Sequence, residues 1–415
     1  MNHASPHILI VNQHGENRGD EAAMRAMVNA FVKRLNGVSF TLLYQFRSGD
    51  VKPQFDENVN CLPMVMPFHK AVALSVYALC RTVKLSLPFI LDAATKQIIH
   101  AYDKADLIIS APGGPYLGDI YYKHEIVHWF FIWLSGIYRK PVMLYAPSVG
   151  PFRIKPLNMI RKRLFKRFNV VCVREKISKE YIDQLCRKHI DVYVTADSAL
   201  QRSFPAFERH EYFQDDRAQL AGRFLVGVSA IQYSFPGKSN VREMQDHYVG
   251  ALLECLIHLG KKRDCHFLFF PQLYGSFHSD VPFLNEIGSK LPPVLSWEIV
   301  DNTLDSDMQQ RLFAMTDLCI ASRYHPQIFA ASAGVPGICI YYEHKAFGFM
   351  DMIGMKDLAF DIRNLESKEV CSKLDEILER RDELSAIMKE RIFPLREKAG
   401  QTTTLAVNLL TDLRR

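Results

Sequence analysis

The most informative absences in this chain of 415 residues concern export, metals and phosphate-binding loops. The N-terminus shows no secretory signal, and no uninterrupted apolar run reaches the roughly 20 residues that span a bilayer. None of the nine cysteines forms a C-x-x-C pair, which argues against a zinc ribbon or a thioredoxin-like site. Neither G-x-G-x-x-G nor a Walker A sequence is present. We therefore expect a cytoplasmic protein with reduced thiols and no P-loop.

Composition and charge are those of an ordinary globular protein. Hydrophobic residues make up 48% of the chain and charged residues 23%, which excludes disorder for most of its length. The formal net charge of +6 is mild and does not indicate binding to nucleic acid. At about 100–200 residues per domain, the length allows two or three domains.

Short, continuous apolar runs recur along the chain and are separated by stretches with helical spacing. Such runs are typical of parallel strands covered on both faces, and strands that alternate with helices imply a doubly wound sheet. The expected strands lie at residues 7–12, 40–45, 106–111, 141–146, 170–174, 191–196, 224–230, 266–272, 318–322 and 337–342.

The strand pattern lapses over the polar segment from Gln201 to Arg223, which indicates a domain boundary. We therefore expect an α/β protein with two Rossmann-like domains of similar size that face a cleft. The expected division is an N-terminal domain at 1–205, a linker at 206–222, a C-terminal domain at 223–390 and a C-terminal helix at 391–415.

The first expected strand ends in NQHGENRGDE, a glycine-containing turn that opens a helix. Backbone N–H groups at a helix N-terminus attract anions, and glycine permits close approach. Asp20 is expected to be the N-cap of this helix. Either it is only a cap, or it lies with Asn17 and Gly19 on the floor of the cleft as a catalytic residue.

The third expected strand ends in SAPGGPYLGD, residues 110–119. Doubly wound sheets bind ligands at the carboxyl ends of their strands. Gly113 and Gly114 therefore either form a plain turn or let the backbone approach a ligand closely. Tyr116 and Asp119 follow in the same loop as candidate binding residues.

The sequence HEIVH at 124–128 matches the zinc-protease pattern H-E-x-x-H. On a helix, His124 and His128 would share one face. A third ligand is lacking nearby, because Cys172, in an expected strand, is the only His, Asp, Glu or Cys within residues 129–174. The apolar run that follows the motif is typical of a core helix, and we predict no metal site.

The most informative segment is CIASRYHPQIFAASAGVPGICIYYEHK, residues 319–345. Ser322, Arg323 and His325 follow one buried strand, and Lys345 follows the next. Arginine offers a planar fork for carboxylate or phosphate, lysine offers a point charge, and histidine exchanges protons near neutral pH. We expect these groups to converge on an anionic ligand, because the carboxyl ends of parallel strands meet at one edge of a sheet.

Other charged residues allow two interpretations. Arg174 and Asp197 each end an expected strand and are either site residues or members of a salt bridge at the domain interface. A basic cluster at 161–168, RKRLFKRF, is either a solvated helix face or a contact for anionic lipid or a phosphate-rich acceptor. Its basic residues are Arg161, Lys162, Arg163, Lys166 and Arg167.

Taken together, these motifs resemble the polysaccharide pyruvyl transferase family. The similarity runs from Ile8 to about Met355 and includes NRGDEA, APGGPYLGD, YAPSVGPF, VCVRE and VTADSAL. Its most specific part is SRYHPQIFAASAGVPGICIYYEHK, in which R-x-H follows a strand and Gly-Val-Pro comes after it. The resemblance implies a GT-B-like fold.

The resemblance also implies a function. Phosphoenolpyruvate would be the co-substrate, with no other cofactor, and a sugar of a cell-surface polysaccharide or its lipid-linked precursor would be converted to a pyruvate ketal. Arg323 and His325 match the family's donor-site Arg and His. The expected roles are catalysis by His325 and Asp20, donor binding by Arg323, Arg174, Lys345, Gly113, Gly114 and Ser322, and acceptor binding by Asn17, Tyr116 and Asp119.

The alternative is a GT-B-type glycosyltransferase with a nucleotide-sugar donor. In that case Glu343 would bind the ribose, and a helix N-terminus with basic side chains would bind the diphosphate. Under either function, an enzyme without a spanning helix would meet lipid-carried glycans at the inner face of the membrane. The contact would involve the basic cluster at 161–168 and a broken apolar stretch around Val72–Leu91.

Overall fold

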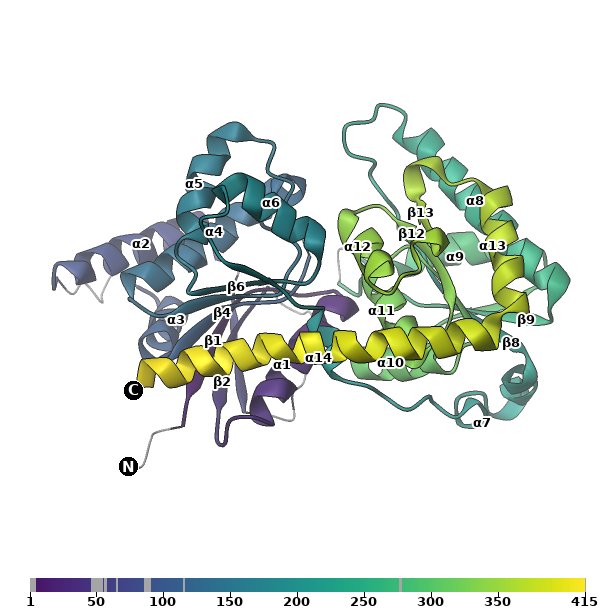
Figure 1. Cartoon of the computed structure of the whole chain (residues 1–415), viewed down its shortest axis with the longest axis horizontal. Coiled ribbons are helices and arrows are strands. Elements are labelled where there is room, and N and C mark those ends of the chain that lie inside the picture. Colours follow the sequence, from purple (N-terminus) through teal and green to yellow (C-terminus); the bar gives the residue numbers. More distant parts are fainter. Residues whose placement is uncertain are drawn as a thin grey trace. The chain divides into compact units, whose positions relative to one another are not determined.

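The computed structural model describes residues 5–45, 55, 58–64, 66–85, 91–114, 116–275 and 278–414. The chain forms two compact units (Figure 1). The first comprises Met1–Glu16, Asp20–Gln201 and Arg396–Arg415, and the second comprises Asn17–Gly19 and Arg202–Leu395.

The first unit contains a seven-stranded parallel sheet with the order β3-β2-β1-β4-β5-β6-β7. The strand order reverses between β1 and β4, and such a switch point is where doubly wound sheets bind ligands. The strands are β1 (His7–His14), β2 (Ser39–Gln45), β3 (Val59–Pro63), β4 (Leu107–Ser110), β5 (Val142–Tyr145), β6 (Val170–Val173) and β7 (Val192–Val194).

Side chains of β1 alternate between two hydrophobic cores, one on each face of the sheet. Ile8 packs in the core formed with α1 (Arg18–Val32) and the end of α14 (Arg381–Arg414). Its neighbour Leu9 packs in the core formed with five other helices. Because both faces are covered, the strand is buried throughout and carries a continuous apolar run from Ile8 to Val11. The five helices are α2 (Phe68–Thr82), α3 (Ala93–Lys104), α4 (Tyr122–Ile137), α5 (Lys155–Phe165) and α6 (Lys176–Cys186).

The second unit repeats this plan with a six-stranded parallel sheet of order β10-β9-β8-β11-β12-β13. The strands are β8 (Phe224–Ser229), β9 (Cys265–Phe269), β10 (Ser296–Ile299), β11 (Leu318–Ala321), β12 (Gly337–Tyr341) and β13 (Ala359–Asp361). Its longer helices are α8 (Val241–Lys262), α9 (Val281–Ser289), α10 (Ser306–Ala314), α11 (Tyr324–Ala333), α12 (His344–Met352) and α13 (Ser367–Glu379).

The expected class, α/β with two Rossmann-like parallel sheets, is confirmed. All ten strands expected from apolar runs are present, but β3, β10 and β13 were not expected. These three strands are short, lie at sheet edges and are largely half-buried or exposed, so they lack the continuous apolar run of a central strand. The segment expected as a linker at 206–222 contains α7 (Arg209–Tyr212) and η4 (Asp215–Gly222).

The basic cluster at 161–168 is not the continuous exposed surface that the sequence suggested. Arg161 is 1% exposed, and its Nε and Nη2 atoms donate to the Glu125 carboxylate at 2.9 and 2.7 Å. Nη2 also lies 2.8 Å from Asp119. Arg167 donates to two backbone carbonyls, so only Lys162, Arg163 and Lys166 are exposed. The buried Arg161 cluster instead joins α5 to α4.

We expect Arg161→Met to lower the free energy of unfolding of the first unit by about 3–5 kcal/mol, because it leaves the buried Glu125 carboxylate without its cation. Lys162→Met on the exposed face is the matched control, with an expected change within about 0.5 kcal/mol. Urea unfolding followed by tryptophan fluorescence measures both. Equal losses in the two variants would contradict a stabilising role for the buried cluster.

Candidate functional site

An arginine that is paired with an aspartate follows the carboxyl end of β11. Arg323 stands directly before α11, and its Nη2 atom lies 2.5 Å from Oδ1 of Asp280. The other oxygen of Asp280 accepts backbone N–H groups from Gln272 and Leu273, both at 3.0 Å. These bonds fix the carboxylate, and the carboxylate in turn orients the guanidinium fork.

Ser322 ties the ends of β8 and β11 together at the switch point of the second sheet. Its N–H donates to the carbonyl of Ser229 at 2.6 Å, and its hydroxyl lies 2.7 Å from the hydroxyl of Tyr248. Burial raises the pKa of Tyr248 to about 12, so this phenol stays protonated at neutral pH.

His325 is the second residue of α11, and its ring packs against Gly19. A Cβ atom at Gly19 would lie 1.9 Å from Nδ1 of His325, so only glycine fits here. Both residues belong to the second unit, as does Arg18, whose guanidinium lies 3.7 Å from the ring centroid of Tyr274. The segment Asn17–Gly19 is therefore built into the surroundings of His325.

Lys345 follows β12, the strand next to β11. Its Nζ atom lies 2.7 Å from Oε2 of Glu343, and both side chains are largely buried. The ring centroids of Tyr324 and Tyr342 lie 5.9 and 5.8 Å from Nζ. Each basic side chain at this sheet edge thus has a carboxylate partner in contact with it.

In the first unit, the structure corrects the expected role of Asp20. Helix α1 begins at Arg18, and Oδ1 of Asn17 accepts the N–H of Gly19 at 2.8 Å, so Asn17 is the capping residue. Asp20 is the third residue of α1, and the Tyr116 hydroxyl donates to its carboxylate at 3.1 Å. A Cβ atom at Gly113 would lie 3.4 Å from the same carboxylate. Asp20, Tyr116 and Gly113 therefore form one group between the ends of β1 and β4.

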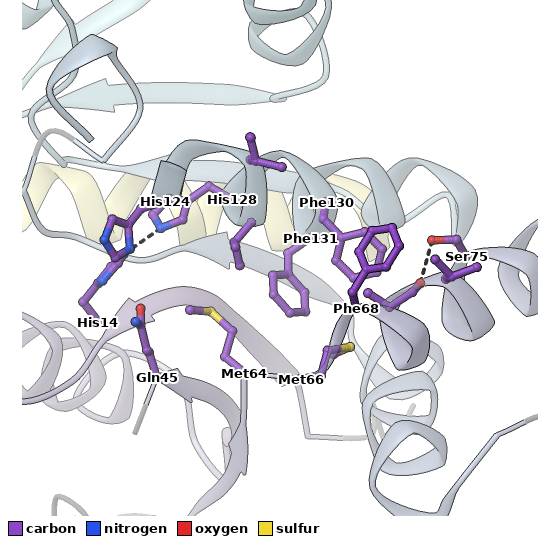
Figure 2. Close-up of a pocket in the computed structure, with 14 residues that line it drawn as sticks. His14, Gln45, Met64, Met66, Phe68, Ser75, His124, His128, Phe130 and Phe131 are labelled. Atoms are coloured by element: carbon purple, nitrogen blue, oxygen red, sulfur yellow. Dashed lines mark hydrogen bonds between the residues drawn. The ribbon is translucent and has the colours of Figure 1, made fainter. Parts of the chain in front are cut away.

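Sequence reasoning missed His14, the last residue of β1. Its ring stacks on Tyr116 at a centroid distance of 3.6 Å, and its Nε2 atom lies 2.8 Å from Nε2 of His128. The ring centroid of His124 is 5.4 Å away from that of His14 (Figure 2). His14 could have been found from its position at the end of β1, the strand beside the switch point. The H-E-x-x-H motif therefore meets a third histidine, from a distant part of the chain.

These three imidazoles are held neutral. Burial lowers the pKa of His14 well below its ordinary value, lowers that of His128 to about 3 and also lowers that of His124. In the described ranges, no group of three or more His, Cys, Asp or Glu side chains has a geometry that could hold a metal ion.

Two expected site residues have other contacts. The side chain of Arg174 is fully buried, with Nη1 2.5 Å from Asp197 and Nε donating to Ser148 at 2.8 Å. Asp119 pairs with Arg161, and its carboxylate accepts the N–H groups of the Arg153–Ile154 segment. Arg174 and Asp197 thus pair with each other, both within the first unit, and Asp119 supports the backbone at residues 153–154.

Two Rossmann-like units, each built on a parallel sheet with a switch point, are the architecture of the GT-B fold class. Known structures agree in fold: HepE of Anabaena in complex with UDP-glucose is 14% identical, with a TM-score of 0.59 and coverage of 99% of this chain and 100% of that one. UDP-GlcNAc 2-epimerase from Neisseria meningitidis is 11% identical, with a TM-score of 0.56 and coverage of 98% and 100%.

The family follows from the sequence comparisons. The family model for polysaccharide pyruvyl transferases matches residues 17–344. The amylovoran biosynthesis protein AmsJ of Erwinia amylovora is 22% identical over 413 residues, which cover 93% of this chain and 96% of AmsJ. This chain belongs to the polysaccharide pyruvyl transferase family and is a transferase, as its motifs predicted.

The lowered pKa of His128 makes stability depend on pH. Between pH 6.5 and about 3, the unfolded chain binds a proton at this position that the folded chain does not, so stability falls as the pH falls. Each such histidine contributes about 1.4 kcal/mol per pH unit within this window. We expect His128→Gln to reduce the slope of unfolding free energy against pH by that amount.

The measurement is chemical unfolding at several pH values from 7 to 4. His189→Gln is the matched control, because it makes the same change of side chain at an exposed histidine. An unchanged slope in His128→Gln would mean that the folded protein protonates this residue as readily as the unfolded chain does.

Proposed function

We propose that this enzyme transfers, in the cytoplasm, the pyruvyl group of phosphoenolpyruvate to two hydroxyls of a polysaccharide sugar or its lipid-linked precursor. Membership in the polysaccharide pyruvyl transferase family supports the reaction type. The observation that carries the assignment of the donor end is the group formed by Ser322, Arg323, His325 and Lys345 at the carboxyl ends of two neighbouring strands, β11 and β12.

The reaction needs no oxidant or reductant. A proton adds to the methylene carbon of phosphoenolpyruvate, and the adjacent carbon becomes oxocarbenium-like. One sugar hydroxyl bonds to that carbon and loses its proton, the carbon–oxygen bond to phosphate breaks, and phosphate leaves with a proton. The second hydroxyl then closes the ketal and loses its own proton. The two sugar hydroxyls lose two protons in total. These balance the proton added to the methylene carbon and the proton that leaves with phosphate.

In this proposal, Arg323 binds the carboxylate or phosphate of the donor through its planar fork, and Lys345 adds a point charge. Their carboxylate partners, Asp280 and Glu343, orient them before the donor arrives. His325 is the general acid or base. In the first unit, Asp20, whose carboxylate accepts the Tyr116 hydroxyl, is the proposed proton acceptor for a sugar hydroxyl, and this pair is the proposed acceptor end.

A nucleotide-sugar donor is the competing hypothesis. The fold is shared with HepE, whose structure contains UDP-glucose, but at 14% identity this likeness concerns the fold alone. Glu343, the residue considered for ribose binding, already contacts Lys345.

The donor is tested by ligand-induced stabilisation. A ligand at 100 times its dissociation constant stabilises a protein by about 2.7 kcal/mol, so we expect phosphoenolpyruvate to raise the melting temperature of the wild-type protein. Arg323→Lys keeps the charge but loses the fork, and we expect at least a tenfold weaker dissociation constant. Arg363→Lys, at an exposed arginine of the same unit, should leave phosphoenolpyruvate binding intact. Stabilisation by UDP-glucose alone would overturn the proposal in favour of a glycosyltransferase.

The proton-transfer role of His325 predicts a specific kinetic pattern. In His325→Ala, one limb of the pH–rate profile should disappear, and kcat should fall by about 10²–10⁴-fold with a smaller change in KM. Gly19→Ala should act in the same direction, because the added methyl group displaces the imidazole. Release of inorganic phosphate from phosphoenolpyruvate in the presence of acceptor glycan is the readout. A raised KM with unchanged kcat would reduce His325 to a binding residue.

A further inference from the structure

The first unit contains an apolar cavity of about 490 Å³ that begins at the proposed acceptor end. The imidazoles of His14, His124 and His128 lie at one end of it, as Figure 2 shows. Toward the other end the lining changes to the rings of Phe68 and Phe130, which come from α2 and α4. The cavity is therefore mostly apolar, and its histidine end adjoins Tyr116, on which His14 stacks.

A second cavity, of about 770 Å³, extends this hollow along α4. The two cavities share Ser75, Ile126 and Phe130, and the second one reaches Trp133 and Arg163. We call the two together the α2–α4 groove. Between His124 and Ile137 the helix rises by about 20 Å, so the groove extends over about that length.

The walls of the α2–α4 groove expose large apolar side chains. Phe68 is 85% exposed, Ile126 58% and Leu79 50%. A continuous exposed apolar surface of this kind costs free energy in water and marks a binding site for an apolar partner. Residues 86–90, which complete the apolar stretch noted in the sequence, lie outside the described residues.

The far end of the groove is basic. Arg163, which is exposed on α5, and the half-buried Arg167 both line the second cavity there. Helices α2 and α5 contain no Asp or Glu, and the carboxylate of Glu125 on α4 is buried against Arg161. The groove thus runs from neutral imidazoles at the proposed acceptor end to basic side chains at its far end.

We propose that the α2–α4 groove binds the hydrocarbon tail of a lipid-linked acceptor, with the sugar presented to Asp20 and Tyr116. This inference rests on the proposed function. No helix in the described part of the chain combines the length and apolarity that crossing a membrane requires. An elongated apolar hollow fits a hydrocarbon chain, whereas docking on a flat bilayer needs a protruding apolar surface.

The probe for the test is hexadecyl phosphate brominated on its chain, used below its micelle concentration. Bromine quenches tryptophan on contact, and Trp129 and Trp133 both line the second cavity, whereas Trp297 belongs to the other unit. We expect saturable quenching of part of the fluorescence, and none with methyl phosphate, which carries the phosphate without the tail.

Ile126→Glu places a charge where the two cavities join, and we expect at least a tenfold weaker affinity for the brominated lipid. Met159→Glu is the matched control, because Met159 is 61% exposed on α5 and lines neither cavity. Equal quenching in wild type and Ile126→Glu would overturn the proposal. So would binding to anionic vesicles without binding of the lipid probe, or a wild-type dimer that Ile126→Glu converts to a monomer.

The same variant separates this inference from the proposed function. Ile126→Glu should keep its stabilisation by phosphoenolpyruvate, because the substitution lies in the first unit and the proposed donor residues lie in the second. Loss of lipid binding with a retained donor response supports the groove. A wild-type protein that binds the lipid but never responds to phosphoenolpyruvate would contradict the proposed donor and leave the groove in place.

Discussion

Parallel strand pairing is the constraint on which the rest of this structure depends. It brings the carboxyl ends of all strands in a sheet to one edge. Where the strand order reverses, between β1 and β4 and between β8 and β11, the loops leave in opposite directions and a crevice opens between them. Both units fill this crevice in the same way, with polar links across it. Asp20 meets Tyr116 in the first unit, and Ser322 meets Ser229 in the second. The proposed site residues lie at this edge because the loops that contain them begin at the fixed ends of the strands.

The two switch points differ in charge, and the difference matches the proposed division of labour. The second unit holds Arg323 and Lys345 in place with buried carboxylates, an arrangement suited to orienting an anion. The first unit surrounds Asp20 with a phenol and glycine, and the nearby imidazoles stay neutral because burial lowers their pKa values. Neutral imidazoles of this kind suit sugar hydroxyls, and they line one end of the apolar groove.

Sequence reasoning succeeded where a signal was local. Central strands such as β4 and β11 are buried on both faces and therefore read as apolar runs, and Arg323 and His325 stand out because they directly follow a strand. Sequence reasoning failed where the partner of a residue is distant in the sequence. Asp280 lies 43 residues before Arg323, and His14 lies 114 residues before His128, so neither contact could be read from spacing. Arg161 looked like part of a surface cluster, because the sequence does not show that a helix turns it toward Glu125.

The central claim is that phosphoenolpyruvate binds at the carboxyl ends of β11 and β12. A crystal structure of the full chain with phosphoenolpyruvate tests this claim most directly. The account predicts that the donor's carboxylate or phosphate contacts the guanidinium of Arg323, with its methylene carbon within reach of His325. Donor density at the end of β1 beside Asp20, with none in contact with Arg323, would contradict it.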